Sequence, residues 1–247
     1  MTLKDTLVTL VERLTDAHIY RVLPRGLDLR HDIANALRAY QVDVVFDVGA
    51  NIGQWARKCL SWFPNADVYS FEPVERTFRQ LLENVQGNER VHCIRQALGS
   101  SSRTGTMVLE GTSDMYFMLD EKDAPACHNA PTEAVDIVTV DAFCRAGGID
   151  GIHYLKIDTE GGDLEVLKGA DDMLACQAID LVEVEAGMHA ANKRHVPFEV
   201  LKDHLQSRGY SLFGIYEQVT EWPTKETHLR RANVAFISRR MIEANRG

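Results

Sequence analysis

The chain has 247 residues, of which 45% are apolar and 26% charged, and its formal net charge is −9. This length suits one α/β domain with a small extension and allows a sizeable buried core. The acidic balance argues against a general nucleic-acid surface. No apolar run is long enough to span a membrane. Charged residues interrupt the first apolar run, whereas a signal peptide needs an uninterrupted one, so no signal peptide is predicted.

The five cysteines are odd in number and lack paired C-x-x-C spacing. They are therefore interpreted as reduced thiols of a cytoplasmic protein, and a zinc site is not predicted.

The first 40 residues precede the first predicted strand. Leucines and valines at helical spacing predict an amphipathic helix over 3–15, and 31–40 is predicted as a second helix. We treat residues 1–40 as a helical extension of a domain that spans 41–247. Such a pair of helices can form a lid, join the subunits of a homo-oligomer, or pack against the edge of the sheet.

The strongest motif is the run VVFDVGANIG. Its β-branched and aromatic residues are typical of a central parallel strand, and Asp47 lies where that strand should end. Gly49 and Gly53 allow a sharp turn and a close approach to a ligand, and Asn51 tolerates unusual dihedral angles. Apolar residues at helical spacing follow. The motif predicts a strand, a glycine loop and a helix that holds a nucleotide-like ligand at its N-terminus.

A second acidic strand end follows. Residues 67–71, DVYSF, form the next predicted strand, which runs into Glu72 and Pro73. About 20 residues beyond a glycine loop, an acidic side chain in a βαβ unit can accept hydrogen bonds from both ribose hydroxyls. Pro73 starts a helix to about residue 85. An alternative role for Glu72 is to complement the charge at that helix N-terminus.

The two motifs together favour one ligand. The loop has neither the GxGxxG spacing of dinucleotide-binding proteins nor the lysine of a phosphate loop. A carboxylate repels phosphate but suits hydroxyls and an ammonium group. S-adenosylmethionine has both and lacks phosphate, so we predict it as the cofactor. Its amino-acid end is assigned to Asp47, Gly49 and Asn51 in the loop that Gly53 closes, its ribose to Glu72 and its adenine to Ala97.

The rest of the chain continues as strands and helices. Residues 95–99 are predicted to wall the adenine, 121–132 to form a surface excursion, and 222–231 to lie in a long loop between the last two strands. The other predicted strands are 91–94, 106–109, 135–140, 152–158, 179–185, 210–216 and 233–238, and the other helices are 141–147, 164–170 and 197–208.

Charged side chains interrupt two of the apolar strands. Lys156 and Asp158 share one face of their strand, because side chains alternate with a period of two. Burying an unpaired charge costs several kcal/mol, so these groups need a partner, a metal or a substrate. Ligands of a doubly wound sheet bind at the carboxyl ends of its strands. The acidic residues at predicted strand ends are Asp47, Glu72, Asp158 and Glu185.

Several hypotheses for these groups stay open. Lys156 forms a structural ion pair with Glu183, or it belongs to the catalytic group. Asp158 or His189 accepts the proton of an acceptor hydroxyl, although a lone loop histidine is also compatible with plain exposure. The candidate ligands of a divalent cation such as magnesium are Asp158, Glu160 and Glu185.

These segments resemble the FkbM-type methyltransferases. The matching runs are FDVGANIG (46–53), FEP (71–73), AL (97–98), LKIDTEGGDLEVLKGA (155–170) and LVEVE (181–185). Thr159 stands where the family usually has valine, and Gly162 and Asp163 replace the usual Ala-Glu pair. The resemblance covers roughly residues 42–240.

The resemblance implies an α/β doubly wound sheet of seven strands in the order 3-2-1-4-5-7-6, mostly parallel, with strand 7 antiparallel. It also implies methyl transfer from S-adenosylmethionine to a hydroxyl of a small molecule or glycan, such as a sugar, a glycoconjugate or a specialised metabolite. Basic stretches at Lys193-Arg194-His195 and Arg230-Arg231 suit an anionic acceptor such as a sugar phosphate or uronate, or plain solvation. Two alternatives are a nicotinamide-dependent oxidoreductase on a similar sheet and a non-catalytic cofactor-binding protein.

Overall fold

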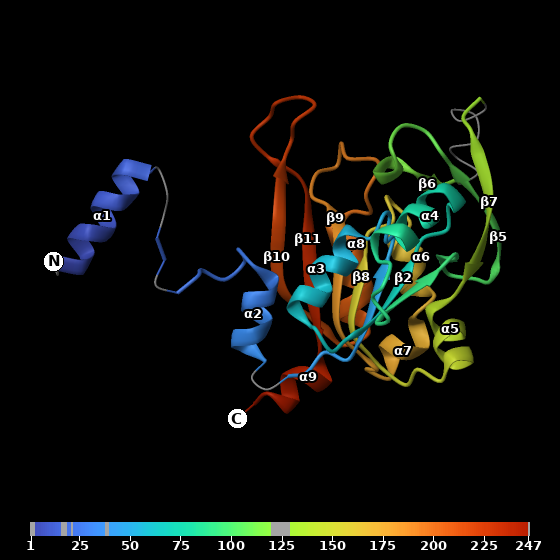
Figure 1. Ribbon diagram of the computed structural model, residues 1–247, viewed down its shortest axis with the longest axis horizontal. Helices are drawn as coiled ribbons and strands as arrows, with labels where there is room; N and C mark the ends of the chain where they lie inside the picture. The colour runs from blue at the N-terminus through green and yellow to red at the C-terminus, as the bar shows by residue number, and fades with distance from the viewer. Residues whose placement is uncertain (1–2, 16–18, 21, 38–39, 120–128, 247) are drawn as a thin grey trace.

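The computed structural model describes the chain except residues 1–2, 16–18, 21, 38–39, 120–128 and 247 (Figure 1). A seven-stranded sheet forms its centre, in the order β10-β11-β9-β8-β1-β2-β3. The bounds are β1 Val44–Val48, β2 Asp67–Phe71, β3 Val91–Ile94, β8 Ile152–Ile157, β9 Ile179–Gly187, β10 Tyr210–Thr220 and β11 Leu229–Ser238.

The strand order agrees with the expected topology. When only these seven strands are numbered along the chain, the order is 3-2-1-4-5-7-6. β11 pairs antiparallel with both β9 and β10, and the other pairs are parallel. The predicted α/β doubly wound class is confirmed. The carboxyl ends of the parallel strands therefore share one edge of the sheet.

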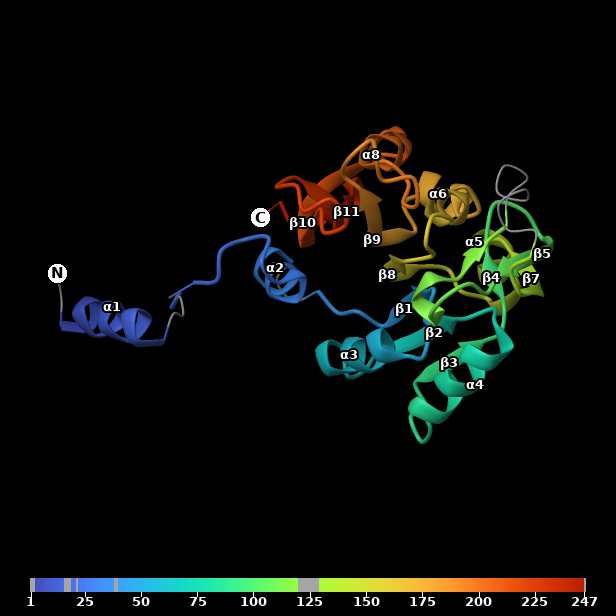
Figure 2. The same ribbon diagram turned by 90° about the horizontal axis from the view of Figure 1, so that it is seen from above.

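Helices cover both faces of this sheet, as Figure 2 shows for α2, α3 and α4 on one side and α5, α6 and α8 on the other. Apolar side chains fill both interfaces, among them Ala56 and Cys59 on the first side and Val166 and Leu201 on the second. The central strands β1, β8 and β9 are buried on both faces and are accordingly mostly apolar. The bounds are α2 Leu29–Ala36, α3 Gln54–Trp62, α4 Glu75–Asn84, α5 Val140–Gly147, α6 Asp163–Lys168, α7 Asp171–Ala175, α8 Phe198–Ser207 and α9 Arg239–Ala244.

A second, four-stranded sheet was not predicted as a unit. Its order is β4-β7-β5-β6, and it is inserted in the chain between β3 and β8. Its strands are β4 Ala97–Leu98, β5 Arg103–Val108, β6 Phe117–Met118 and β7 Thr132–Val138, with a 3-10 turn at Ser113–Met115. Most of the predicted surface excursion, 121–132, lies outside the described residues.

The N-terminal helices differ in how they join the body. α1, Leu3–Thr15, stands apart from the sheet in both views (Figures 1 and 2), and Leu14 on it is 75% exposed. α2 is held by Asp32, whose carboxylate accepts hydrogen bonds from the backbone of Gly26 and from Tyr216 of β10. Association of subunits through this extension stays a prediction, which sedimentation of the full chain would test. Among the described residues, no helix has the length and apolar character needed to cross a bilayer.

Three predicted positions shift. Asp47 is the fourth residue of β1 and is 0% exposed, so it lies inside the strand and not at its mouth. Glu185 likewise lies within β9, which extends to Gly187. The predicted long loop at 222–231 is a tighter hairpin, because β10 and β11 pair as far as Thr220 and Leu229.

Candidate active site

A cavity of about 300 Å³ lies across the carboxyl edge of the main sheet. The strand order arranges its lining from one end to the other, because every strand of the main sheet except β9, or the loop after it, contributes residues in turn. Following the order from β3 to β10, the lining residues include Ala97, Glu72, Gly49, Asp158, Asn233 and Glu217.

The glycine loop forms the middle of the cavity floor. Gly49 has φ +81°, and a Cβ at this position would overlap the backbone carbonyl of Asp158. The backbone N–H groups of Gly49 and Ala50 donate to the carbonyl of Phe71, at 3.1 and 2.9 Å. Asn51 also adopts a left-handed conformation, with φ 48°. The loop therefore needs glycine because its backbone passes close to the carbonyl of Asp158 at the end of β8. Gln54, the first residue of α3, lines the cavity just beyond this loop.

Gly53 has a different role from the one predicted. It has φ +83° at the N-cap of α3, and it is not among the described residues that line the cavity. A Cβ there would lie 2.7 Å from Cδ1 of Leu81 on α4. Gly53 therefore permits the packing of α3 against α4, and the geometry gives it no direct contact with a ligand.

Glu72 fastens the glycine loop to the next strand end. Its Oε2 accepts from the backbone N–H of Asn51 at 3.1 Å, and its Oε1 accepts from that of Val74 at 2.9 Å. The side chain lines the cavity and is otherwise buried. Burial raises the pKa of Glu72 to about 7, although the two backbone hydrogen bonds act in the opposite direction. Each oxygen keeps a lone pair for a hydroxyl donor.

The second sheet roofs this half of the cavity. Met107 of β5, Met118 of β6 and Ile137 of β7 face it with apolar side chains, next to Ala97. Ser113 donates a hydrogen bond of 2.8 Å to Oδ1 of Asn51, which ties the roof to the glycine loop. An apolar slot beside the carboxylate of Glu72 suits a flat aromatic base.

A buried lysine lies between two carboxylates at the centre of the cavity. Lys156 Nζ is 3.5 Å from Oδ1 of Asp47 and 3.3 Å from Oδ2 of Asp158. Burial acts to lower the pKa of Lys156, but the carboxylates of Asp158, Asp47 and Glu183 together raise it above its usual value. Lys156 therefore stays protonated and does not suit the role of a base. Asp47 lies behind it, outside the cavity lining, and acts on a ligand only through Lys156.

Glu183 is not paired with Lys156 as its nearest partner. The hydroxyl of Tyr154 donates to its Oε2, on the face of the sheet below α3. Burial raises the pKa of Glu183, while this hydrogen bond and the charge of Lys156 lower it. The structural ion pair that we considered is thus replaced by a tyrosine contact, with Lys156 acting at longer range.

His189 lies outside the cavity. Its ring contacts that of His228 on the β10–β11 hairpin at a tilt of 36°, with 3.9 Å between the ring centroids, and the residue is exposed. Of the described residues that line the cavity, none is a histidine. The exposed alternative therefore fits His189 better than a catalytic role.

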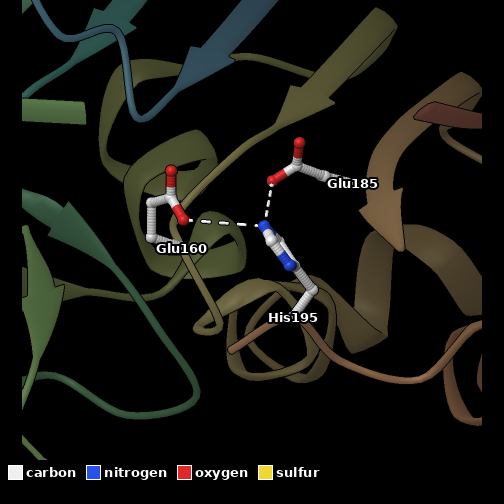
Figure 3. A group of neighbouring side chains, drawn as sticks. All are labelled: Glu160, Glu185 and His195. Atoms are coloured by element: carbon white, nitrogen blue, oxygen red, sulfur yellow. Dashed lines mark ion pairs between the residues drawn. The ribbon is translucent and has the colours of Figure 1, made fainter. Parts of the chain in front are cut away.

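The predicted metal ligands do not all meet. Glu160 and Glu185 come together with His195, and their ligand atoms lie within 4.8 Å of one another. Figure 3 shows Nε2 of His195 facing both carboxylates, at 2.7 Å from Glu185 and 3.6 Å from Glu160. Asp158 is not part of this group, because it pairs with Lys156. His195 was predicted only as part of a basic loop and not as a partner of these carboxylates, because no sequence spacing links that loop to either strand.

Each carboxylate of this group already has a cation. Arg194 Nε donates to Oε2 of Glu160, and Arg231 pairs with Oε1 of Glu185. Burial raises the pKa of Glu160, and the hydrogen bond and charge of Arg194 lower it. Arg194 also donates to the carbonyl of Met115, at 2.6 Å. The group therefore joins the loop after β9 to the roof of the cavity and balances its charge with arginines.

The sequence did not single out the far end of the cavity. Gln54 and Trp55 of α3, Asn233 of β11 and Glu217 of β10 line it. Trp55 stacks on Tyr154, with 5.5 Å between centroids and 15° between the ring planes. Polar and aromatic residues within strands and helices carry no motif, so only the folded arrangement reveals this group.

Fold and site together define a class of protein. A doubly wound sheet in the order 3-2-1-4-5-7-6, with a buried carboxylate at the end of its second strand, an apolar slot beside it and no phosphate loop, is typical of S-adenosylmethionine-dependent methyltransferases. The model of the methyltransferase FkbM domain matches residues 47–212, which is more than half of the chain. The chain belongs to the FkbM methyltransferase family.

Two named relatives extend this similarity. The chain is 32% identical over 176 residues to the hexuronic acid methyltransferase AglP of Haloferax volcanii, covering 69% of this chain and 67% of that protein. It is 24% identical over 182 residues to the 2-O-methyltransferase NoeI of Sinorhizobium fredii, covering 68% and 74%. Membership of this family supports an S-adenosylmethionine-dependent methyltransferase over the nicotinamide-dependent and non-catalytic alternatives.

Proposed function

We propose that this enzyme transfers the methyl group of S-adenosylmethionine to a hydroxyl of a sugar, a glycoconjugate or a specialised metabolite, with Asp158 as the proton acceptor. The observation that carries the proposal is the place of Asp158. It lies where the cofactor half of the cavity, along β3, β2 and β1, meets the half along β8, β11 and β10. The names of the two relatives, one of them a 2-O-methyltransferase, support a hydroxyl acceptor.

The chemistry follows from this arrangement. The sulfonium supplies an activated methyl group when the cofactor is bound. The chain's own residues must align an acceptor oxygen with it and remove a proton. Asp158 Oδ2 is held by Lys156, and its side chain is 38% exposed, so the carboxylate is fixed on one side and open on the other. Glu72 and the glycine loop would orient the nucleoside.

A direct assay tests the proposal. Purified protein is incubated with methyl-labelled S-adenosylmethionine and panels of glycosides, glycolipids and polyhydroxylated metabolites. We expect label in an ether that survives mild base, which would cleave a methyl ester. Label only in an ester or an amine would contradict methylation of a hydroxyl while leaving the cofactor assignment intact.

Glu72 supports a prediction about cofactor binding and pH. Ribose hydroxyls donate to the ionised carboxylate, which is only partly populated near its pKa of about 7. S-adenosylhomocysteine should therefore bind more tightly as pH rises from 6 to 8. Glu72→Gln should weaken binding about tenfold at pH 8, on the order of 1.4 kcal/mol, and remove most of the pH dependence. Calorimetry measures both, and equal affinities for the two proteins at pH 8 would rule out ribose binding by Glu72.

The pairing of Glu160 and Glu185 bears on whether methyl transfer needs a divalent cation. We propose that the arginines beside Glu160 and Glu185 take the place of a cation, so that methyl transfer needs none. Their pairing with both carboxylates supports this proposal, because a divalent ion would have to displace them or add to their charge. EDTA-treated enzyme should keep its full rate, and magnesium should add nothing. Loss of activity in EDTA with recovery in magnesium would instead favour a cation at Glu160, Glu185 and His195.

A further inference from the structure

The cavity continues beyond the place where the methyl group would lie. Past Asp158, its walls are Trp55 on the α3 side and Asn233 and Glu217 on the last two strands. The strand order places this part three and more strands away from β2 and β3, where the ribose and base slots are. This end of the cavity is therefore free for an acceptor.

Glu217 is held in this end by an unusual backbone. It has φ 43°, a left-handed conformation that costs a residue with a side chain about 1–2 kcal/mol. It follows Tyr216 at a bulge, where the pairing of β10 with β11 shifts between Tyr216 and Val219. Tyr216 points into the core, and the bulge turns the next side chain toward the cavity.

The carboxylate of Glu217 is oriented but still open to solvent. Its Oε1 lies 3.3 Å from Nζ of Lys58, and its Oε2 accepts from Nδ2 of Asn233 at 3.1 Å. The side chain is nevertheless 61% exposed. The carboxylate of Glu217 therefore keeps lone pairs for hydroxyl donors, at the end of the cavity that Trp55 also lines.

The charge of this end is negative. Among the described lining residues beyond the glycine loop, Asp158, Glu160 and Glu217 are acidic, and Lys156 is basic but already lies between two carboxylates. The arginines nearby, Arg194 and Arg231, are paired with Glu160 and Glu185. The ammonium of Lys58 likewise already lies 3.3 Å from Glu217. A carboxylate on the acceptor at this end would therefore face like charge, next to cations that already have carboxylate partners.

We propose that Glu217, turned into the cavity by the β10 bulge, is the specificity-determining residue of the acceptor site, which takes an uncharged polyhydroxylated ring and rejects one that carries a carboxylate. Glu217 accepts hydrogen bonds from ring hydroxyls, and Trp55 offers an aromatic face. This inference rests on the proposed function, and it sets the acceptor apart from the substrate in the name of the hexuronic acid relative.

The test compares matched sugars on protein loaded with S-adenosylhomocysteine. The probes are methyl hexopyranosides and the corresponding methyl hexuronosides, and binding is measured by saturation-transfer NMR. We expect the neutral sugar to bind at least tenfold more tightly. Glu217→Gln should reduce that preference about tenfold by improving uronoside binding, and Glu226→Gln, on the same hairpin but outside the cavity lining, should leave it unchanged.

A second variant separates recognition from a structural role of the bulge. Glu217→Gly should raise the melting temperature by about 2–4 °C, because glycine adopts this conformation without strain, and weaken hexopyranoside binding about tenfold. A more stable variant with unchanged sugar binding would overturn the proposal. So would a wild-type preference for the uronoside, or binding of neither sugar by protein that binds S-adenosylhomocysteine. Methylation of a uronoside would overturn this proposal about the acceptor and leave methyl transfer to a hydroxyl intact. Protein that fails to bind S-adenosylhomocysteine would contradict the proposed function itself.

Discussion

Asp158→Asn should lower the rate of methyl transfer by about 10²–10⁴-fold, the usual contribution of a positioned proton acceptor. The amide keeps the size of the side chain but does not accept a proton. Because S-adenosylhomocysteine lacks the positive sulfur, its affinity should change little. Single-turnover transfer from labelled S-adenosylmethionine measures the rate of methyl transfer, and calorimetry measures the affinity for S-adenosylhomocysteine.

A matched variant controls for the loss of one negative charge. Asp172 on α7 pairs with Arg145 at 3.6 Å, and both side chains are largely exposed. Asp172→Asn should therefore keep the wild-type rate. If Asp158→Asn retained more than a tenth of the wild-type rate, Asp158 would not be the proton acceptor, and another group along the far half of the cavity would have to be sought.

Gly49→Ala should have the largest effect on stability and on cofactor binding. The left-handed conformation at φ +81° costs alanine about 1–2 kcal/mol. Overlap of the new Cβ with the carbonyl of Asp158 adds the cost of overpacking, about 1–3 kcal/mol. Denaturant unfolding measures the sum. The loop that shifts to relieve the overlap also carries the N–H group bonded to Glu72, so the affinity for S-adenosylhomocysteine should fall more than tenfold.

Gly87 provides the control for this variant. It has nearly the same dihedral angle, φ +82°, but a Cβ there would meet nothing within 4 Å. Gly87→Ala should lower the free energy of unfolding only by the conformational cost of alanine at positive φ, and it should leave the affinity for S-adenosylhomocysteine unchanged. If the two variants lost equal stability and both bound S-adenosylhomocysteine normally, the close contact of Gly49 with the backbone of Asp158 would have no role in the site.

Local sequence was informative where chemistry and geometry are both local. The glycine loop, the helix after it and Glu72 were predicted because a strand, a turn that needs φ above zero and an acidic strand end follow one another within about 20 residues. β2 and β3 were predicted with the bounds they have in the structure. The order of the seven strands came from resemblance to a family and not from periodicity.

Charge pairing was beyond the reach of the sequence. Which carboxylate lies beside Lys156 depends on the register of β8 with β1, where Lys156 is opposite Asp47. A shift of one residue would have turned the lysine to the other face. For the same reason the predicted metal group lost Asp158 and gained His195, whose loop joins β9 to α8.

The sequence by itself determined the glycine loop at Gly49, the acidic strand end at Glu72 and, through the family resemblance, the class of cofactor. Only the tertiary structure decided the rest. The second sheet covers the cavity because its apolar side chains face it, and Glu217 lines the far end of the cavity at the bulge in β10. The physical reason is that cofactor recognition uses consecutive residues, whereas the acceptor end is assembled from strands that are distant in sequence and adjacent only in the sheet.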